Sequence, residues 1–234
     1  MYLYKPVMKK YILLLSIVSL LFSSCATLEP GLFRSNSKNS VLLPTLDPQF
    51  DMRSLNAYYP EIISGGNYMK ATKDSNNVNI AYEAYPVQIK QNILSQDIIN
   101  IFERDVKDNI TDPFGDYKGA IVCKVVYANQ KSKNIALTVL STITLGIGNL
   151  LGLPTCSEEM AMDIEVEIYD LSDKLIGRYS SQGYDKEWVA LYYGYDTSDA
   201  IRKANAIAFK NAMSNIKEQI NQDADRLSEI LNNQ

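Results

Sequence analysis

The pattern of apolar and polar residues along the chain predicts two amphipathic helices. Within 87–110, apolar residues recur at helical spacing and polar residues fill the remaining positions. The apolar stripe consists of Leu94, Ile98, Ile101, Phe102, Val106 and Ile110. A second stretch, 198–231, repeats this pattern and predicts one long closing helix, which Ser198 caps.

The closing helix is too long for a small sheet to cover. At about 1.5 Å per residue it extends roughly 50 Å, whereas the strands of a small sheet span about 20 Å. We therefore expect its C-terminal part to project and to contact a partner helix or a second copy of the chain; fraying into solvent is the alternative. The stripe for this contact consists of Ile216, Ile220, Leu227 and Leu231.

Between the two helices, alternation and β-branched residues predict strands. The stretch 119–128 is rich in β-branched residues, and 159–170 alternates apolar residues with acidic residues and a tyrosine, which predicts one buried and one solvated face. The sequence "LSDK" then turns the chain into 175–188, so these two stretches form a β-hairpin. An apolar run at 40–46 predicts the first strand, and 47–85 predicts loops with short strands at most. The predicted fold is α+β: a small mixed or antiparallel sheet with an amphipathic helix, a β-hairpin and a long C-terminal helix.

Composition narrows the classes of function. The 234 residues are 46% hydrophobic and 21% charged, which is typical of a globular protein with a sizeable core. The net charge of −4 leaves no surplus of lysine and arginine for a phosphate backbone, so we expect no nucleic-acid partner. The chain contains no histidine, which excludes Ser-His-Asp and Cys-His nucleophiles and every His-ligated metal site. We expect no metal, no cofactor and no enzymatic activity.

The N-terminus has the three regions of a secretory signal: two lysines, an apolar run and the small residues of "SSCA". The ending "LFSSC" resembles a bacterial lipoprotein signal, although Phe22 stands where leucine is usual. The resemblance implies a signal peptide at 1–24 and cleavage before Cys25, which then carries a diacylglyceryl group and palmitate. An uncleaved anchor with a buried cysteine is the alternative. Residues 25–39 then form the lipidated cysteine and its tether, and 40–234 form a single domain.

Lipidation at Cys25 implies that the protein is located in the cell envelope. Two or more acyl chains hold a protein stably on a bilayer, whereas one chain gives only marginal binding. No run of acidic residues follows Cys25, and this favours a position that faces the periplasm. We expect the outer membrane rather than the inner membrane.

The order of the predicted elements resembles that of small envelope lipoproteins of Gram-negative bacteria. It comprises the lipidated cysteine, a strand with "VLLP", a helix, a strand, an apolar segment ending in "GLPT", a hairpin turning at "SDK" and a closing helix. The N-terminal α/β domain of the Tol-Pal system's periplasmic protein and the core of the curli-secretion lipoprotein are similar in this order. The loop-rich 47–85 departs from the curli type. The resemblance implies a non-enzymatic binding or assembly role, with an envelope protein partner or self-association.

Three carboxylates on one predicted strand face are the candidates for chemistry. Asp163, Glu165 and Glu167 share this face, and paired carboxylates serve glycoside hydrolases or bind cations. A solvated acidic strand face is the alternative explanation. The second functional hypothesis is therefore a carboxylate-dependent glycan or lipid hydrolase, although we assign no catalytic residue. The aromatic stretch 188–196 either packs inside the fold or contacts a glycan or a partner.

Residues 134–157 contain no charged side chain, yet they are too polar to cross a membrane. Threonines, serines, a proline and glycines interrupt the apolar residues, and the flanking charges have the wrong polarity for a crossing. If helical, the segment packs partly on the core and partly against the bilayer or a membrane partner; full burial is the alternative. The candidate contact residues are Leu140, Ile143, Ile147, Leu150 and Leu151.

Two cysteines remain once Cys25 is lipidated. Cys123 and Cys156 are an even pair in an oxidising compartment and form a possible disulfide. A buried free thiol at Cys123 is the alternative, and the sequence leaves both open.

Overall fold

The computed structural model describes residues 30–33, 39–59, 62–64, 69–73, 79–84, 88–90, 92–133, 139, 143, 147, 154–189 and 197–233. The elements of the N-terminal part are η1 (Pro30–Phe33), β1 (Asp47–Phe50), α2 (Met52–Tyr58), β2 (Ile62–Ser64), β3 (Met69–Lys73), β4 (Asn79–Ala84) and β5 (Gln88–Lys90). They are followed by α3 (Ile93–Asp105), η2 (Val106–Ile110), β6 (Gly119–Lys133), β7 (Cys156–Asp170), β8 (Leu175–Val189), α6 (Thr197–Gln222) and α7 (Ala224–Asn232). The expected signal peptide and Cys25 lie outside the described residues.

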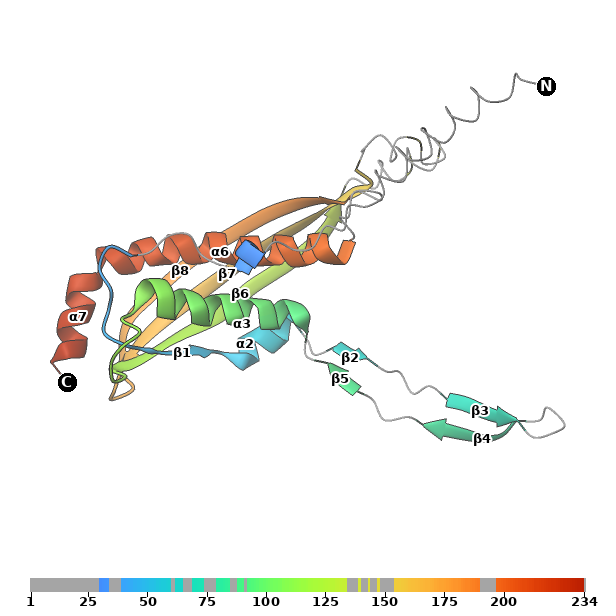
Figure 1. The fold of residues 1–234 in the computed structure, drawn as a ribbon, viewed down its shortest axis with the longest axis horizontal. Helices are drawn as coiled ribbons and strands as arrows, with labels where there is room; N and C mark the ends of the chain where they lie inside the picture. Colours follow the sequence, from blue (N-terminus) through green and yellow to red (C-terminus); the bar gives the residue numbers. More distant parts are fainter. Residues whose placement is uncertain are drawn as a thin grey trace, which may run out of the picture. The chain divides into compact units, whose positions relative to one another are not determined.

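Four strands form one sheet in the order β1-β6-β7-β8, with β1 parallel to β6 (Figure 1). The pairs β2–β5 and β3–β4 form two separate antiparallel sheets. The four-stranded mixed sheet with its helices makes an α+β fold, as the residue pattern predicts. The chain divides into two compact units, a first unit of 1–32, 129–161 and 184–208 and a second unit of 33–128, 162–183 and 209–234. Residues 40–234, expected as a single domain, thus contribute to both units.

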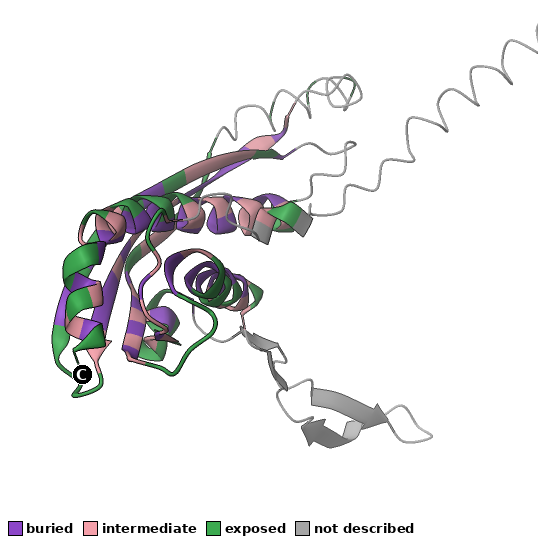
Figure 2. Cartoon of the chain, turned by 60° about the vertical axis from the view of Figure 1, so that its left-hand side comes forward, coloured by how far each residue is buried: buried purple, intermediate pink, exposed green. Residues whose placement is uncertain are grey.

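The core of the second unit lies between the sheet and the helices α3 and α6. The Phe50 ring of β1 packs edge-on against Phe102 of α3, with 5.8 Å between ring centroids, and lies 6.4 Å from Phe209 of α6. Figure 2 shows buried residues in purple and exposed residues in green on the same helices, so these helices are amphipathic. On β7, the alternate apolar positions predicted to face the core are all buried: Met162, Ile164, Val166 and Ile168.

The first strand begins later than predicted. Leu43 and Leu46 are buried in the core, but they do not form part of a strand. Both are almost fully buried, and Leu43 forms only an isolated bridge to Thr111. The strand proper includes Pro48. The Asp51 N–H donates to the Cys123 carbonyl at 2.9 Å, so alternate residues face β6 and Pro48 faces outward. A proline is tolerated there because an edge strand leaves that side unpaired.

Helix α2 lies within 47–85, where the sequence predicts only loops and short strands. Asp51 caps it, since the Asp51 carboxylate accepts from the Arg53 N–H at 3.0 Å. Two α2 side chains then reach the backbone of β6 beyond the short β1. The Tyr58 hydroxyl donates to the Val126 carbonyl at 2.5 Å, and the Val125 N–H donates to a serine of α2 at 3.1 Å. Helix α2 therefore continues the cover of the sheet edge that β1 begins.

Helix α3 begins at Ile93 rather than at 87, because 88–90 form β5. The Asn92 side chain caps it by accepting from the Leu94 N–H at 2.9 Å. The predicted apolar stripe is buried except at its first residue, Leu94, which is half-buried. At the C-terminal end the buried Asp105 forms a 3.0 Å ion pair with the buried Lys217 of α6. This pair joins the two helices inside the second unit.

The predicted hairpin is present, and it turns at 171–174. The Asp170 carboxylate accepts from the Ser172 N–H at 2.8 Å and the Lys174 N–H at 3.0 Å. Asp173 has a φ of 58°, the left-handed conformation that such a turn needs. Gly119 of β6 lies against this hairpin so closely that a Cβ would overlap the Tyr169 carbonyl.

The closing helix is not continuous, and the expectation that its end projects is wrong. It breaks at Asp223, where φ is −104° and ψ is 6°. The Asp223 carboxylate accepts from the Tyr179 hydroxyl at 2.6 Å and pairs with Arg226, which also donates to the Ile176 carbonyl at 2.9 Å. The break lets α7 pack back on β8. The stripe that was expected to meet a partner is fully buried in the second unit: Ile216, Ile220, Leu227 and Leu231.

We expect Leu227→Ala to lower the free energy of unfolding by about 2–5 kcal/mol, because it removes a fully buried side chain and leaves a cavity. Urea denaturation of the purified protein measures this. Asp225→Ala, an exposed position on the same helix, is the matched control and should change stability little. Equal stabilities of the two variants would mean that α7 does not pack as described.

Candidate functional site

The three candidate carboxylates lie on β7, but one of them is not solvated as predicted. Glu165 and Asp163 are half-buried, whereas the Glu167 side chain has no exposed surface. The alternation correctly puts Glu167 on the face opposite the helices. The expectation of a wet acidic face is wrong at this position, because long neighbouring side chains cover the carboxylate.

Glu167 is held by partners from three strands. The Arg178 guanidinium of β8 lies 2.5 Å from one carboxylate oxygen, and Lys124 of β6 pairs with the other. The Tyr169 hydroxyl donates to the carboxylate at 2.6 Å. Burial raises the pKa of Glu167, but the hydrogen bonds from Lys124, Tyr169 and Arg178 outweigh it and bring the pKa down from 4.5 to about 2.

This arrangement does not suit acid–base or nucleophilic chemistry at Glu167. A carboxyl group with a pKa of about 2 is ionised at neutral pH and cannot donate a proton. Its oxygens are already engaged by two cations and a hydroxyl, so none is free to attack a substrate. Glu165 lies beside the same cluster, with 3.8 Å between its carboxylate and Arg178 Nε. The geometry is that of an ion-pair network on a sheet face.

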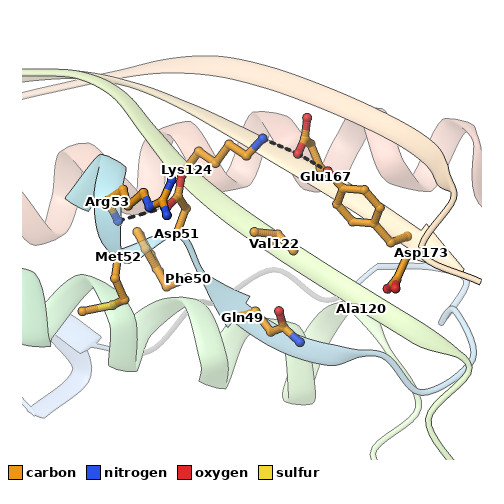
Figure 3. Close-up of a pocket in the computed structure, with 11 residues that line it drawn as sticks. Gln49, Phe50, Asp51, Met52, Arg53, Ala120, Val122, Lys124, Glu167 and Asp173 are labelled. Atoms are coloured by element: carbon orange, nitrogen blue, oxygen red, sulfur yellow. Dashed lines mark hydrogen bonds and ion pairs between the residues drawn. The ribbon is translucent and has the colours of Figure 1, made fainter. Parts of the chain in front are cut away.

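An open pocket of about 510 Å³ adjoins this network in the second unit (Figure 3). Its lining residues come from β1, α2, β6, β7 and the hairpin turn: Gln49, Phe50, Asp51, Met52, Arg53, Ala120, Val122, Lys124, Glu167, Tyr169 and Asp173. The close-up labels Arg53 at one end of the pocket and Asp173 at the other. Such a lining of apolar, aromatic and charged side chains suits a polar ligand or a peptide. No sequence motif marks this pocket, because its walls are far apart in the chain.

The uncharged segment exposes the apolar side chains that the structure describes. Val139, Ile143 and Ile147 are helical and expose 54%, 72% and 60% of their surface. These three residues lie four positions apart in the sequence and are called the apolar row below. The alternative that the whole segment is buried is therefore wrong for Ile143 and Ile147. The other candidate contact residues lie outside the described residues: Leu140, Leu150 and Leu151.

At the point where this segment leaves and rejoins the sheet, the first unit carries charged and aromatic side chains. Glu159 of β7 pairs with Lys133 of β6 at 2.5 Å and with Lys186 of β8 at 3.3 Å. The Lys186 ammonium lies 4.7 Å from the centroid of the Trp188 ring. Trp188 is 46% exposed, so the first residue of the aromatic stretch 188–196 is not packed inside. The rest of that stretch lies outside the described residues.

The described part of the chain also bears on candidate metal ligands and thiols. Over those residues, no group of three or more acidic or cysteine side chains is placed to hold a metal ion. Cys123 and Cys156 are both free thiols in the structure, and burial raises the pKa of Cys123 well above its usual value. None of the described helices is long and apolar enough to span a bilayer.

Comparison with protein-family models gives no match, and comparison with curated proteins finds no similar sequence.

We expect the contribution of Glu167 to stability to depend on pH. Its pKa is lower in the folded protein than in the unfolded chain, so its stabilisation is complete above about pH 4.5 and is lost as the pH falls toward 2. At pH 7, Glu167→Gln should lower the free energy of unfolding by about 1–3 kcal/mol, because Lys124 and Arg178 lose a charged partner. Urea denaturation of both proteins from pH 7 down to pH 2 should show this difference shrinking.

Asp163→Asn is the matched control, since it removes a carboxylate from the same strand face outside the Glu167 cluster. A Glu167→Gln effect that stays constant over the whole pH range would contradict the ion-pair network.

Proposed function

We propose that the protein is a membrane-anchored envelope lipoprotein with a non-enzymatic binding or assembly role at the periplasmic face. The N-terminal sequence supports the anchor, because a charged region, an apolar run and "LFSSC" precede a cysteine suited to lipidation. The outer membrane is the proposed location, and a position that faces the periplasm is favoured because no acidic run follows Cys25.

The observation that carries the binding role is the exposed apolar row in the uncharged segment. Val139, Ile143 and Ile147 each expose more than half of their surface. Apolar side chains that are exposed to this extent within one uncharged segment are typical of contacts with a membrane or another protein. This supports the candidate contacts at Ile143 and Ile147, and we extend the proposal to Leu140, Leu150 and Leu151.

The chemistry of the sheet face favours binding over catalysis. The deepest carboxylate, Glu167, is ionised and engaged by three donors. The lining of the adjoining pocket combines opposite charges with apolar residues such as Ala120 and Val122, which suits recognition of a polar segment of an envelope partner. No observation on the described residues favours the glycan or lipid hydrolase.

We expect metabolic labelling with radioactive palmitate to label the wild-type protein and not Cys25→Ala, because Cys25 is the proposed site of acylation. The wild-type protein should pellet with the outer-membrane fraction, and the variant should lose this association. Cys156→Ala, which leaves the proposed lipidation site intact, is the matched control and should be labelled like the wild type. Absence of label in the wild type would refute the lipoprotein assignment.

A further inference from the structure

Aromatic side chains are exposed at one end of three strands in the first unit, and the segment that carries the apolar row joins two of these strands at that end. Strand β6 ends at Lys133, the uncharged segment follows, and β7 begins at Cys156 (Figure 1). The returning chain is tied to the end of β8, because the Thr155 N–H donates to the Val189 carbonyl at 2.8 Å. The exposed apolar row therefore leaves from, and returns to, the strand end that carries Trp188.

Strand β8 presents amphipathic side chains at this end. Tyr184, Lys186 and Trp188 alternate along the strand and so share one face of it, over a span of about 13 Å. Tyr184 and Trp188 are 53% and 46% exposed. Side chains with an apolar body and a polar tip are enriched where a protein meets the interface between lipid and water. Lysine is suited to the same place, because its stem lies in the apolar layer while its ammonium reaches water.

We propose that the strand-end surface, defined as Val139, Ile143, Ile147, Tyr184 and Trp188, rests on the interfacial layer of a lipid bilayer. This inference rests on the proposed function, since acylated Cys25 keeps the chain at a membrane. The row of the uncharged segment enters the boundary of the acyl chains, and the two aromatic rings lie at the level of the headgroups.

The residue types at this end favour lipid over a glycan or a protein. The segment of 134–157 has no charge, whereas charged side chains begin directly at the strand ends that flank it. An apolar segment next to strand ends that mix aromatic and charged side chains matches the change from acyl chains to headgroups at a bilayer interface. The nearby ions are largely paired with each other, as Lys133 and Lys186 both contact Glu159. Attachment should therefore depend on apolar burial rather than on anionic lipids.

Trp188 is the only tryptophan in the chain, so its fluorescence reports on this surface alone. The experiment uses the full lipidated protein in phosphatidylcholine vesicles that contain phospholipids brominated near the headgroup or deep in the acyl chain. We expect shallow bromine to quench about half of the Trp188 emission, and deep bromine to quench less, because tryptophan favours the headgroup level. The quenching should be the same at low and high salt.

The test variant carries Ile143→Asp and Ile147→Asp, two exposed positions where aspartate need not disturb the core. We expect it to stay anchored by its acyl chains while the quenching of Trp188 falls to the level in unbrominated vesicles. The matched control is Phe114→Asp, which changes another exposed apolar residue, with 88% of its surface exposed and outside the strand-end surface, and should keep the wild-type quenching. Circular dichroism confirms that both variants are folded, and Ile143→Ser with Ile147→Ser replaces the test variant if it is not.

The outcomes separate this inference from the proposed function. A protein that floats with vesicles but whose Trp188 is not quenched is a lipoprotein with its strand end away from the membrane, and the inference is then wrong. Protection of Trp188 from acrylamide by soluble peptidoglycan fragments, without quenching by brominated lipid, would assign the surface to a glycan instead. A protein that carries no acyl chain and does not float contradicts the proposed function and the inference together.

Discussion

A buried carboxylate has to be paired, and at Glu167 this requirement fixes three strands against one another. An isolated charge in a protein interior costs several kcal/mol, so Glu167 is stable only while Lys124 of β6 and Arg178 of β8 both reach it. Because side chains alternate along a strand, the same register turns the apolar residues of β7 toward the helices. A slip of β7 by one residue would move the carboxylate into the apolar core. The ion-pair network on one face therefore selects the packing on the other.

Ion pairs also fix the helices relative to each other, because each buried charged side chain needs a partner of opposite charge. The buried pair of Asp105 and Lys217 holds α3 against α6, and an asparagine one turn along donates to Asp105 at 2.6 Å. Removal of either partner would leave an uncompensated charge in the core. At Asp223, hydrogen bonding from Arg226 lowers the pKa of the carboxyl group, and the ionised group accepts from Tyr179 of β8. That contact stabilises the break between α6 and α7, and α7 can then bury its stripe.

The residue pattern predicts those parts of the fold that depend on local periodicity. The helical period identifies α3, β-branched residues identify the first part of β6, alternation identifies β7, and "LSDK" identifies the turn into β8. The residue pattern does not predict features that depend on residues far apart in the chain. No residue near Asp223 in the sequence predicts a helix break, because its hydrogen-bond partner Tyr179 belongs to β8. In the same way, alternation assigns Glu167 to the correct face but not its burial, which Lys124 and Arg178 impose. No sequence pattern predicts the pocket, because β1, α2, β6 and the hairpin turn are brought together only by the fold.

The edge of β8 bears on which surface of the protein is available to partners. An unpaired strand edge is a template for pairing with another chain. In the second unit, however, side chains of the C-terminal helices occupy this edge: Gln219 donates to the Ser180 carbonyl at 3.1 Å, and Arg226 donates to the Ile176 carbonyl at 2.9 Å. Strand addition there would have to displace both donors. Association through this part of the sheet edge is therefore disfavoured. The apolar stripes of α6 and α7 are also buried, whereas Val139, Ile143 and Ile147 are exposed.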